Sequence, residues 1–226
     1  EFDKFWEDGF FEVPIEKTKK IMFKDFRDNP KINALNTPSG KIEITSNTIK
    51  NYNLKDCKGH PTWIEPYEWL GRKENFPLHL ISNQPEYRLH GQLDNAEYSF
   101  KNKIKDREPV LINIKDAKER NIKNNDIVLI FNKRGKVLAG ARLSDEVMRG
   151  VLVLSTGAWF DPDYEINTDL HGNPNVLTKD IGTSQLSQAP TSHTCLVEIR
   201  KAKQNEIKKV KIFLKPQTQK KLEQKY

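Results

Sequence analysis

The sequence predicts a mainly β protein with short helices, built around a small barrel. From Phe76 onward, six short runs rich in Val, Ile and Leu alternate with turn residues. Only one short helical pattern interrupts these runs, and strands this closely spaced favour a barrel. The 226 residues are 36% hydrophobic, which is enough for a real core and for one or two domains.

The chain before Phe76 has weaker patterns. Residues 15–30, "IEKTKKIMFKDFRDNP", show a weak helical period that stops at a proline. Residues 37–49, "TPSGKIEITSNTI", predict a turn followed by a strand in which Ile42 and Ile44 alternate with polar residues. Residues 52–75 hold two prolines and two tryptophans without a period, which indicates an ordered connector.

The six expected strands follow in order, with a helix predicted over "KDAKERN" at 115–121. The strands lie within 76–82, 108–114, a hairpin at 126–144 that contributes two, 150–157 and 194–202. The hairpin should turn at residues 133–136, with Gly135 supplying a positive φ. Asn121 and Asn125 stand where the helix exit and the next turn need left-handed residues, and we interpret both as structural.

The net charge of +7 is concentrated at the C-terminus. Ten Lys or Arg against two Glu fall between Arg200 and Tyr226, a net of +8, so the remaining residues sum to 28 − 29 = −1. A basic region confined to one end is typical of a solvated arm, and it argues against a nucleic-acid-binding body.

Several classes find no support in the sequence. The two cysteines, Cys57 and Cys195, form no C-x-x-C pair, and no Cys/His spacing predicts a zinc site or a disulfide framework. We interpret His60, His79 and His171 as surface or hydrogen-bonded side chains. No apolar run is long enough to cross a membrane, so no membrane insertion is expected. The chain begins without Met and with a cluster of aromatics, so we expect it to be a piece of a longer chain.

The segment "ISNQPEYRLHGQL", residues 81–93, places polar side chains at every second position. If the segment is extended, Arg88, His90 and Gln92 share one face. A cation, an imidazole and an amide do not make a core face, so this pattern predicts either a polar ligand or a solvated strand face.

Longer stretches carry a family resemblance. The run from "EPVLINIKDAKERN" to "GAWFDP", followed by "HGNPNVLTKDIGTSQLSQAPTSHT", resembles the C-terminal domain of the molybdopterin oxidoreductases. The branch it resembles is that of the dimethyl sulfoxide, trimethylamine N-oxide and biotin sulfoxide reductases. The upstream stretch "GHPTWIEPYEWLG" is also similar to that branch, so the resemblance reaches to about Arg200.

The resemblance implies a fold and a cofactor. The fold is a six-stranded double-psi β-barrel, preceded by an α/β segment from a neighbouring domain. The cofactor is molybdenum bis(molybdopterin guanine dinucleotide), completed by N-terminal domains that are missing here. The implied reaction is reduction of S-oxides or N-oxides (trimethylamine N-oxide, dimethyl sulfoxide, biotin or methionine sulfoxide) by oxygen-atom transfer. In this branch an earlier domain supplies a serine ligand to molybdenum, so no catalytic residue and no metal ligand is expected in this chain, which should be inactive alone.

The resemblance also implies which residues contact the dinucleotide, and their chemistry suits it. A guanidinium can bind phosphate with two hydrogen bonds, and amides both donate and accept. The expected contacts are Gln84, Arg88, Asn175, Ser192 and His193, followed by Ser82, Asn83, His90 and Gln92. The chain departs from the family, which often has His at the position of Gln84, Gly-Gln or Gly-His at 192–193, and glycines at 121 and 125.

The resemblance divides the chain and suggests its surroundings. We expect a remnant of the preceding α/β domain at 1–50, the connector at 51–75, the dinucleotide-binding barrel at 76–200 and a basic tail at 201–226. The expected partners are the missing domains and a c-type cytochrome, and the expected location is the periplasm. The alternatives are a non-enzymatic double-psi barrel that serves as a binding module, and a nucleic-acid binder that uses the basic tail.

Overall fold

The computed structural model describes residues 2–14, 19–72 and 75–213, and it divides into two compact units, Glu1–Thr62 and Trp63–Tyr226. The first unit holds three short helices, α1 (Phe2–Asp8), α2 (Lys24–Asp28) and α3 (Asn47–Asn51), none of which contains a buried residue. Helix α3 begins where the Ser46 side chain accepts a hydrogen bond from the backbone of Ile49 at 3.3 Å.

The prediction of a strand around Ile42 and Ile44 is wrong. The backbone there is irregular, and the two side chains are 68% and 75% exposed. A strand needs a neighbour for its backbone groups, and among the described residues of this unit no ladder is present to provide one. The predicted helix at 15–30 is reduced to α2, and residues 15–18 lie outside the described residues.

The second unit holds the β structure. Its strands are β1 (Leu78–Ile81), β2 (Pro109–Asn113), β3 (Ile127–Phe131), β4 (Lys136–Ser144), β5 (Val151–Leu154), β6 (Pro162–Asp163), β7 (Thr168–Asp169) and β8 (Leu196–Lys201). Its helices are η1 (Leu70–Arg72), α4 (Glu97–Asn102), α5 (Ile114–Glu119), η2 (Pro174–Val176) and η3 (Gln204–Glu206). All six strands predicted from Phe76 onward are present.

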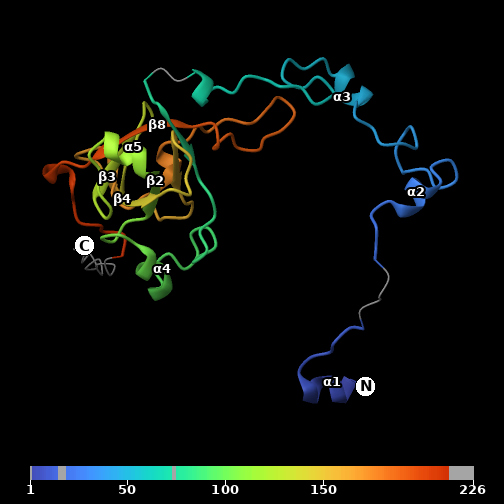
Figure 1. The fold of residues 1–226 in the computed structure, drawn as a ribbon, viewed down its shortest axis with the longest axis horizontal. Coiled ribbons are helices and arrows are strands. Elements are labelled where there is room, and N and C mark those ends of the chain that lie inside the picture. Colours follow the sequence, from blue (N-terminus) through green and yellow to red (C-terminus); the bar gives the residue numbers. More distant parts are fainter. Residues whose placement is uncertain (1, 15–18, 73–74, 214–226) are drawn as a thin grey trace, which may run out of the picture. The chain divides into compact units, whose positions relative to one another are not determined.

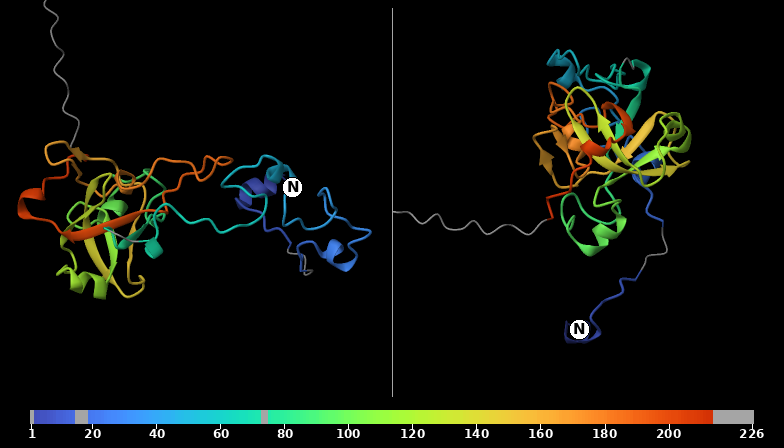
Figure 2. Two further views of the ribbon diagram at one scale, coloured as in Figure 1. Left: turned by 90° about the horizontal axis from the view of Figure 1, so that it is seen from above. Right: turned by 90° about the vertical axis from the view of Figure 1, so that its left-hand side faces the viewer.

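These six strands form a closed barrel, shown from three directions in Figures 1 and 2. The neighbour order is β2-β5-β1-β8-β3-β4, and a parallel pairing of β2 with β4 closes the ring. Strands β1 and β5 form the second parallel pair of the barrel, and the remaining barrel pairs are antiparallel. The predicted mainly β barrel with short helices is therefore confirmed.

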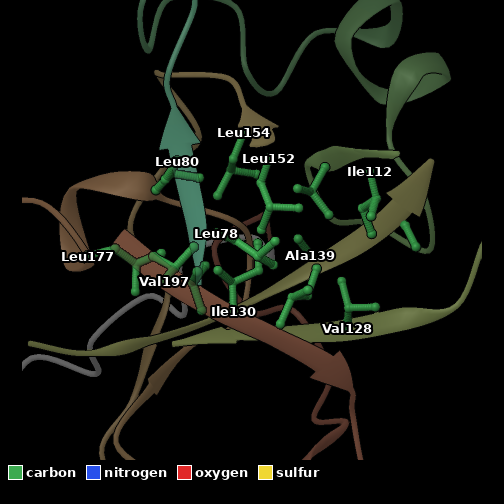
Figure 3. Close-up of a cluster of buried hydrophobic side chains, with 14 of the residues drawn as sticks. Leu78, Leu80, Ile112, Val128, Ile130, Ala139, Leu152, Leu154, Leu177 and Val197 are labelled. Carbon is green, nitrogen blue, oxygen red and sulfur yellow. The ribbon is translucent and has the colours of Figure 1, made fainter. Parts of the chain in front are cut away.

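Apolar side chains from every barrel strand fill the interior (Figure 3). In β3, Val128 and Ile130 point into this core and are fully buried. Ile127 and Leu129, on the alternate face, pack in a second cluster with Leu170 outside the barrel. Strand β3 reads as a continuous apolar run because both of its faces are covered.

The turn chemistry was predicted correctly at the helix exit and incorrectly at the hairpin. Asn121 and Asn125 have φ of 55° and 64°, which confirms their left-handed conformation. The β3–β4 hairpin turns where expected, but Gly135 does not have a positive φ. A Cβ there would lie 2.7 Å from the backbone oxygen of Val176, so the glycine allows a close approach of η2.

The interpretation of residues 201–226 as a solvated arm is wrong for the described part, which ends at Phe213. Val210 is only 7% exposed, and Ile207 packs against the second apolar cluster. The backbone N–H groups of Lys211 and Ile212 donate to one oxygen of Asp161. The composition revealed a lysine-rich segment. It did not reveal that the apolar residues and the backbone between the lysines contact the barrel unit.

Candidate functional site

Parallel pairing of β1 with β5 brings their following loops together at one end of the barrel. The Thr156 N–H donates to the carbonyl of Asn83 at 2.9 Å, and the Ser155 hydroxyl donates to the Asn83 side chain at 2.9 Å. Strand β8 runs antiparallel to β1, and the Leu80 N–H donates to Cys195 just before β8 begins. The loops after β1 and β5 and the chain before β8 therefore meet at one end.

This topology places several of the predicted cofactor residues. Ser82, Asn83 and Gln84 follow β1 directly, and Ser192 and His193 form a turn just before β8. Asn175 lies in η2, and its backbone N–H donates to the side-chain oxygen of Asn173 at 3.0 Å. The side chain of Asn175 is exposed. The connection from η2 is close by, since the Cys195 thiol donates to the Leu177 carbonyl at 3.2 Å.

The segment from Pro85 to Leu93 is not extended, so the expected shared polar face does not form. The chain turns back on itself, and His90 and Leu93 adopt φ of 50° and 63°. Gly157 presses against this turn, because a Cβ at that glycine would lie 1.8 Å from the His90 carbonyl oxygen. As a result His90 and Gln92 are exposed while Arg88 is buried.

Gln84 and His90 are joined by a reciprocal contact across the turn. The His90 N–H donates to the Gln84 side-chain oxygen at 3.1 Å, and the Gln84 amide nitrogen lies 2.7 Å from His90 Nδ1. An amide N–H that donates to Nδ1 leaves the ring proton on Nε2. Both side chains are exposed, so this pair presents a donor edge that a ligand can reach.

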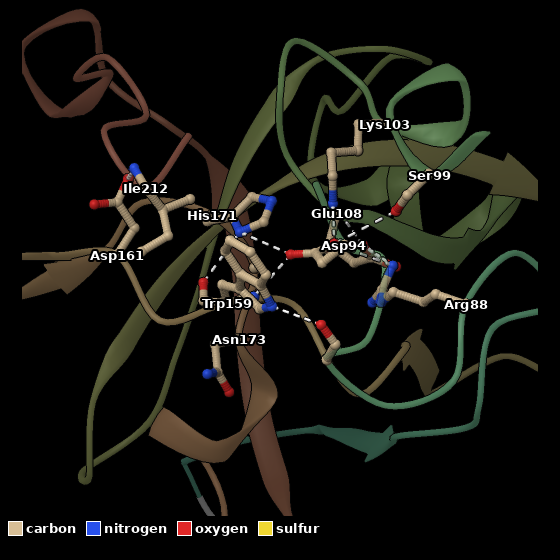
Figure 4. A network of polar contacts seen from close by, with 12 residues as sticks. Arg88, Asp94, Ser99, Lys103, Glu108, Trp159, Asp161, His171, Asn173 and Ile212 are labelled. Atoms are coloured by element: carbon tan, nitrogen blue, oxygen red, sulfur yellow. Dashed lines mark hydrogen bonds and ion pairs between the residues drawn. The ribbon is translucent and has the colours of Figure 1, made fainter. Parts of the chain in front are cut away.

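The guanidinium of Arg88 donates hydrogen bonds to groups of this chain from all three of its nitrogens (Figure 4). Its side chain is fully buried and donates to Glu108 at 2.9 Å and to the carbonyls of Thr156 and His90 at 2.7 and 3.2 Å. Burial alone would lower the pKa of Arg88, but Glu108 and Asp94 raise it above its ordinary value. The predicted contact of Arg88 with the cofactor stays a prediction, and the geometry gives this residue a role in holding the loops.

The same network contains a second buried ion pair. Lys103 Nζ lies 2.6 Å from Asp94, and both side chains are almost fully buried. The other oxygen of Asp94 accepts the backbone N–H of Trp159 at 2.9 Å, which ties the network to the loop after β5. Burial alone would raise the pKa of Asp94, but the Lys103 ammonium and the Trp159 N–H lower it overall.

His171 completes the network as a neutral ring. Its Nδ1 lies 3.0 Å from the Trp159 carbonyl, and burial together with the Lys103 charge lowers its pKa to about 4. Two cations and two carboxylates then balance, which is the condition under which a buried ionic network is tolerated. The loops after β1 and β5 are therefore joined by a closed, charge-balanced cluster that we call the buried ion network: Arg88, Asp94, Lys103, Glu108 and His171.

Two residues of the site carry buried hydroxyls without a partner. Within the described residues, Ser82 Oγ and Thr156 Oγ1 make no hydrogen bond although both atoms are buried. Ser82 was predicted from the sequence, whereas Thr156 was missed. The available signal was its position in "STG" immediately after a strand that pairs in parallel with β1.

A polar cleft of about 320 Å³ opens beside the start of β8. Glu68 lies in it and accepts hydrogen bonds from Arg134 at 2.6 and 3.0 Å and from the Leu196 N–H at 2.8 Å. Burial opposes ionisation of Glu68, but these donors and Lys179 lower its pKa to about 2. Lys133 also lines the cleft, so its wall is rich in cations.

The donor set fits the dinucleotide cofactor that the resemblance implies. The end of the barrel offers two unpartnered hydroxyls, exposed amides at Asn83 and Gln84, and the exposed imidazole of His193. Groups that both donate and accept suit a base and a pyrophosphate, and nearby cations favour an anion. Among the described residues no cluster of His, Cys, Asp and Glu could hold a metal ion, and no helix is long and apolar enough to cross a membrane.

Comparison with known proteins connects this site to a family. Residues 78–196, more than half of the chain, match the family described as "Molydopterin dinucleotide binding domain". The chain is 46% identical over 208 residues to the trimethylamine-N-oxide reductase of Haemophilus influenzae, covering 88% of this chain and 25% of that protein. It is 43% identical over 199 residues to the biotin sulfoxide reductase of Cereibacter sphaeroides, covering 88% and 27%.

A third relative and a solved structure extend the comparison. The dimethyl sulfoxide/trimethylamine N-oxide reductase of Cereibacter sphaeroides is 41% identical over 205 residues, covering 88% of this chain and 25% of that one. Acetylene hydratase from Pelobacter acetylenicus shares the fold with a TM-score of 0.61 and 16% identity, covering 75% of this chain and 24% of that one. The chain thus spans about a quarter of the length of these curated relatives, and it belongs to the molybdopterin dinucleotide-binding domain family.

Proposed function

We propose that this chain is the cofactor-binding C-terminal domain of a molybdenum enzyme that reduces S-oxides or N-oxides. The observation that carries the proposal is 41–46% identity, over 88% of the chain, to three reductases named for trimethylamine N-oxide, dimethyl sulfoxide and biotin sulfoxide. The gathering of hydrogen-bonding residues at one end of the barrel supports it independently.

The cofactor we propose is molybdenum held by two molybdopterin guanine dinucleotides. When bound, it supplies the oxygen-atom transfer and the two-electron redox change, which the protein orients and tunes. The residues of this chain act by binding. Asn83, Gln84 and His90 present donors and acceptors beside the buried hydroxyls of Ser82 and Thr156.

The residues before β8 and in η2 complete the proposed contacts. Ser192 and His193 lie at the same end of the barrel, and Asn175 and Gln92 offer exposed amides. No residue of this chain is assigned to chemistry, since the metal ligand is proposed to lie in a domain that precedes it. Arg88 then acts through the loops that it ties together, with the direct contact still to be tested.

The remaining proposals concern the rest of the enzyme. We propose that residues 1–50 belong to the preceding α/β domain, 51–75 to a connector, 76–200 to the barrel and 201–226 to a C-terminal extension. The proposed partners are the preceding domains and a c-type cytochrome donor, and the proposed location is the periplasm. A non-enzymatic binding module is disfavoured, because the relatives are named as reductases.

A chimera tests the proposal. The matching 208-residue region of the Haemophilus influenzae reductase is replaced by this chain. Molybdenum content and reduction of trimethylamine N-oxide, dimethyl sulfoxide and biotin sulfoxide by reduced viologen are then measured. We expect a loaded, active chimera and no turnover by the 226-residue chain alone. A chimera that folds, as judged by circular dichroism, but contains no molybdenum would contradict the proposal.

A further inference from the structure

After β8 the chain turns and runs along the outside of the barrel, and this return is anchored along its length. We call residues 207–213 the C-terminal strap. The turn into it is fixed by Arg200, whose guanidinium donates to both oxygens of Glu206 at 2.6 and 2.8 Å. These bonds lower the pKa of Glu206 to about 2.

The strap is held by its backbone rather than by its lysines. One oxygen of Asp161 accepts the N–H groups of Lys211 and Ile212 at 2.5 and 3.2 Å, and Arg107 donates to the carbonyl of Lys208. Asp161 and Arg107 are each only 4% exposed. Buried groups that bind backbone fix the path of a segment, whereas exposed lysine pairs contribute little.

The strap ends with its one aromatic side chain against the buried ion network. The ring of Phe213 meets those of Phe100 and His171 edge-on, with centroids 4.6 and 4.7 Å apart, and lies 5.8 Å from that of Trp159. The ammonium of Lys103 is 5.6 Å from the same ring. Aromatic pairs in this edge-on geometry are favourable beyond the area they bury.

Trp159 links Phe213 to the proposed cofactor loops. Its indole N–H donates to the carbonyl of Gly91 at 2.6 Å, and its backbone N–H donates to Asp94 at 2.9 Å. Gly91 belongs to the turn that carries His90, and Trp159 belongs to the loop that carries Thr156. The contacts thus run without a gap from the strap through Trp159 to both loops.

We propose that Phe213 is a positioning residue that, through Trp159, fixes the loops 82–92 and 155–159 in the form that receives the dinucleotide. The strap contacts the buried ion network through Phe213, which meets His171 and Lys103. This inference rests on the proposed function for its purpose, but the coupling between strap and loops can be measured without cofactor.

Amide hydrogen exchange on the 226-residue chain measures that coupling. Phe213→Ala is compared with Ile207→Ala, a strap residue that packs on the second apolar cluster instead of on the network. We expect exchange in 82–92 and 155–159 to become at least tenfold faster in Phe213→Ala and to change less than twofold in Ile207→Ala. Phe213→Leu keeps most of the volume, so it should preserve the fold and show a smaller change in the same segments.

Faster exchange confined to residues 203–213, or equal acceleration throughout the chain in both Phe213 variants, would overturn the inference. The chimera then separates it from the proposed function. Phe213→Ala should lower molybdenum content at least threefold while Ile207→Ala leaves it unchanged. If Gln84→Ala lowers the content and Phe213→Ala does not, the strap has no positioning role although the function stands. If the loops respond in exchange but no variant alters the content, the strap is coupled to the loops and the proposed cofactor contacts are wrong.

Discussion

Replacing Arg88 with Ala should strongly destabilise the chain even without cofactor. The guanidinium is fully buried and lies 2.9 Å from Glu108, whose side chain is also fully buried. Without Arg88, the cation that still pairs with Glu108 among the described residues is Lys103 at 3.5 Å, and that ammonium already binds Asp94 at 2.6 Å. Removing one partner of a buried pair costs about 3–5 kcal/mol, because the other charge stays buried and is less well compensated.

Urea unfolding of the chain gives the free energy of unfolding for each variant. The matched control is Arg200→Ala, which breaks a pair with side chains 36% and 22% exposed and should cost no more than about 1 kcal/mol. A loss of about 3–5 kcal/mol is a large fraction of the stability of a typical domain, so the midpoint should fall clearly. The double variant Arg88→Met/Glu108→Leu should recover part of the loss, since it leaves no unpaired charge.

One result would refute this reasoning about Arg88. If Arg88→Ala changes the free energy of unfolding by less than about 1 kcal/mol while the chimera loses molybdenum, the side chain serves the cofactor directly. The buried contacts would then be a resting arrangement that the ligand replaces. If the stability falls and the molybdenum content of the folded chimera stays unchanged, Arg88 holds the loops and has no direct contact.

Three further outcomes are expected. Burial lowers the pKa of His171 from 6.5 to about 4, so the stabilisation from its neutral ring is fully present above pH 6.5 and is lost as the pH falls toward 4. At about 1.4 kcal/mol per pKa unit, the free energy of unfolding should fall by roughly 3 kcal/mol. Urea unfolding between pH 7 and pH 4 should show this fall, and His171→Asn should lack it. Gly157→Ala should lower the free energy of unfolding by at least about 2 kcal/mol in thermal unfolding, because the residue has a positive φ and no room for a Cβ. The control Gly150→Ala should lower it by only about 1 kcal/mol, because Gly150 also has a positive φ but a Cβ there would have no atom closer than 3.7 Å. Burial raises the pKa of Cys195 to about 11, so iodoacetamide at pH 8 should label the partly exposed Cys57 and leave Cys195 unlabelled until urea is added, as mass spectrometry would show.

Local pattern alone was sufficient for most of the barrel. The six strands were predicted because runs of β-branched and apolar residues are bounded by turn residues, and both signals act over a few neighbouring positions. Asn121 and Asn125 were predicted for the same reason, since the left-handed conformation is a property of a single residue. The family resemblance then predicted the cofactor, and it predicted that the loops after β1 and before β8 bind it.

The tertiary structure decided which of the polar residues at this end of the barrel are exposed. Arg88 and His90 are two positions apart, yet Arg88 is buried and His90 is exposed. Arg88 is buried because its guanidinium donates to Glu108 and to the carbonyl of Thr156 in the loop after β5. The composition of residues 207–213 predicted a basic tail because lysines are frequent there. In the structure, Asp161 instead accepts hydrogen bonds from the backbone N–H groups of Lys211 and Ile212. Both outcomes depend on partners far away in the sequence, and a local pattern carries no information about such partners.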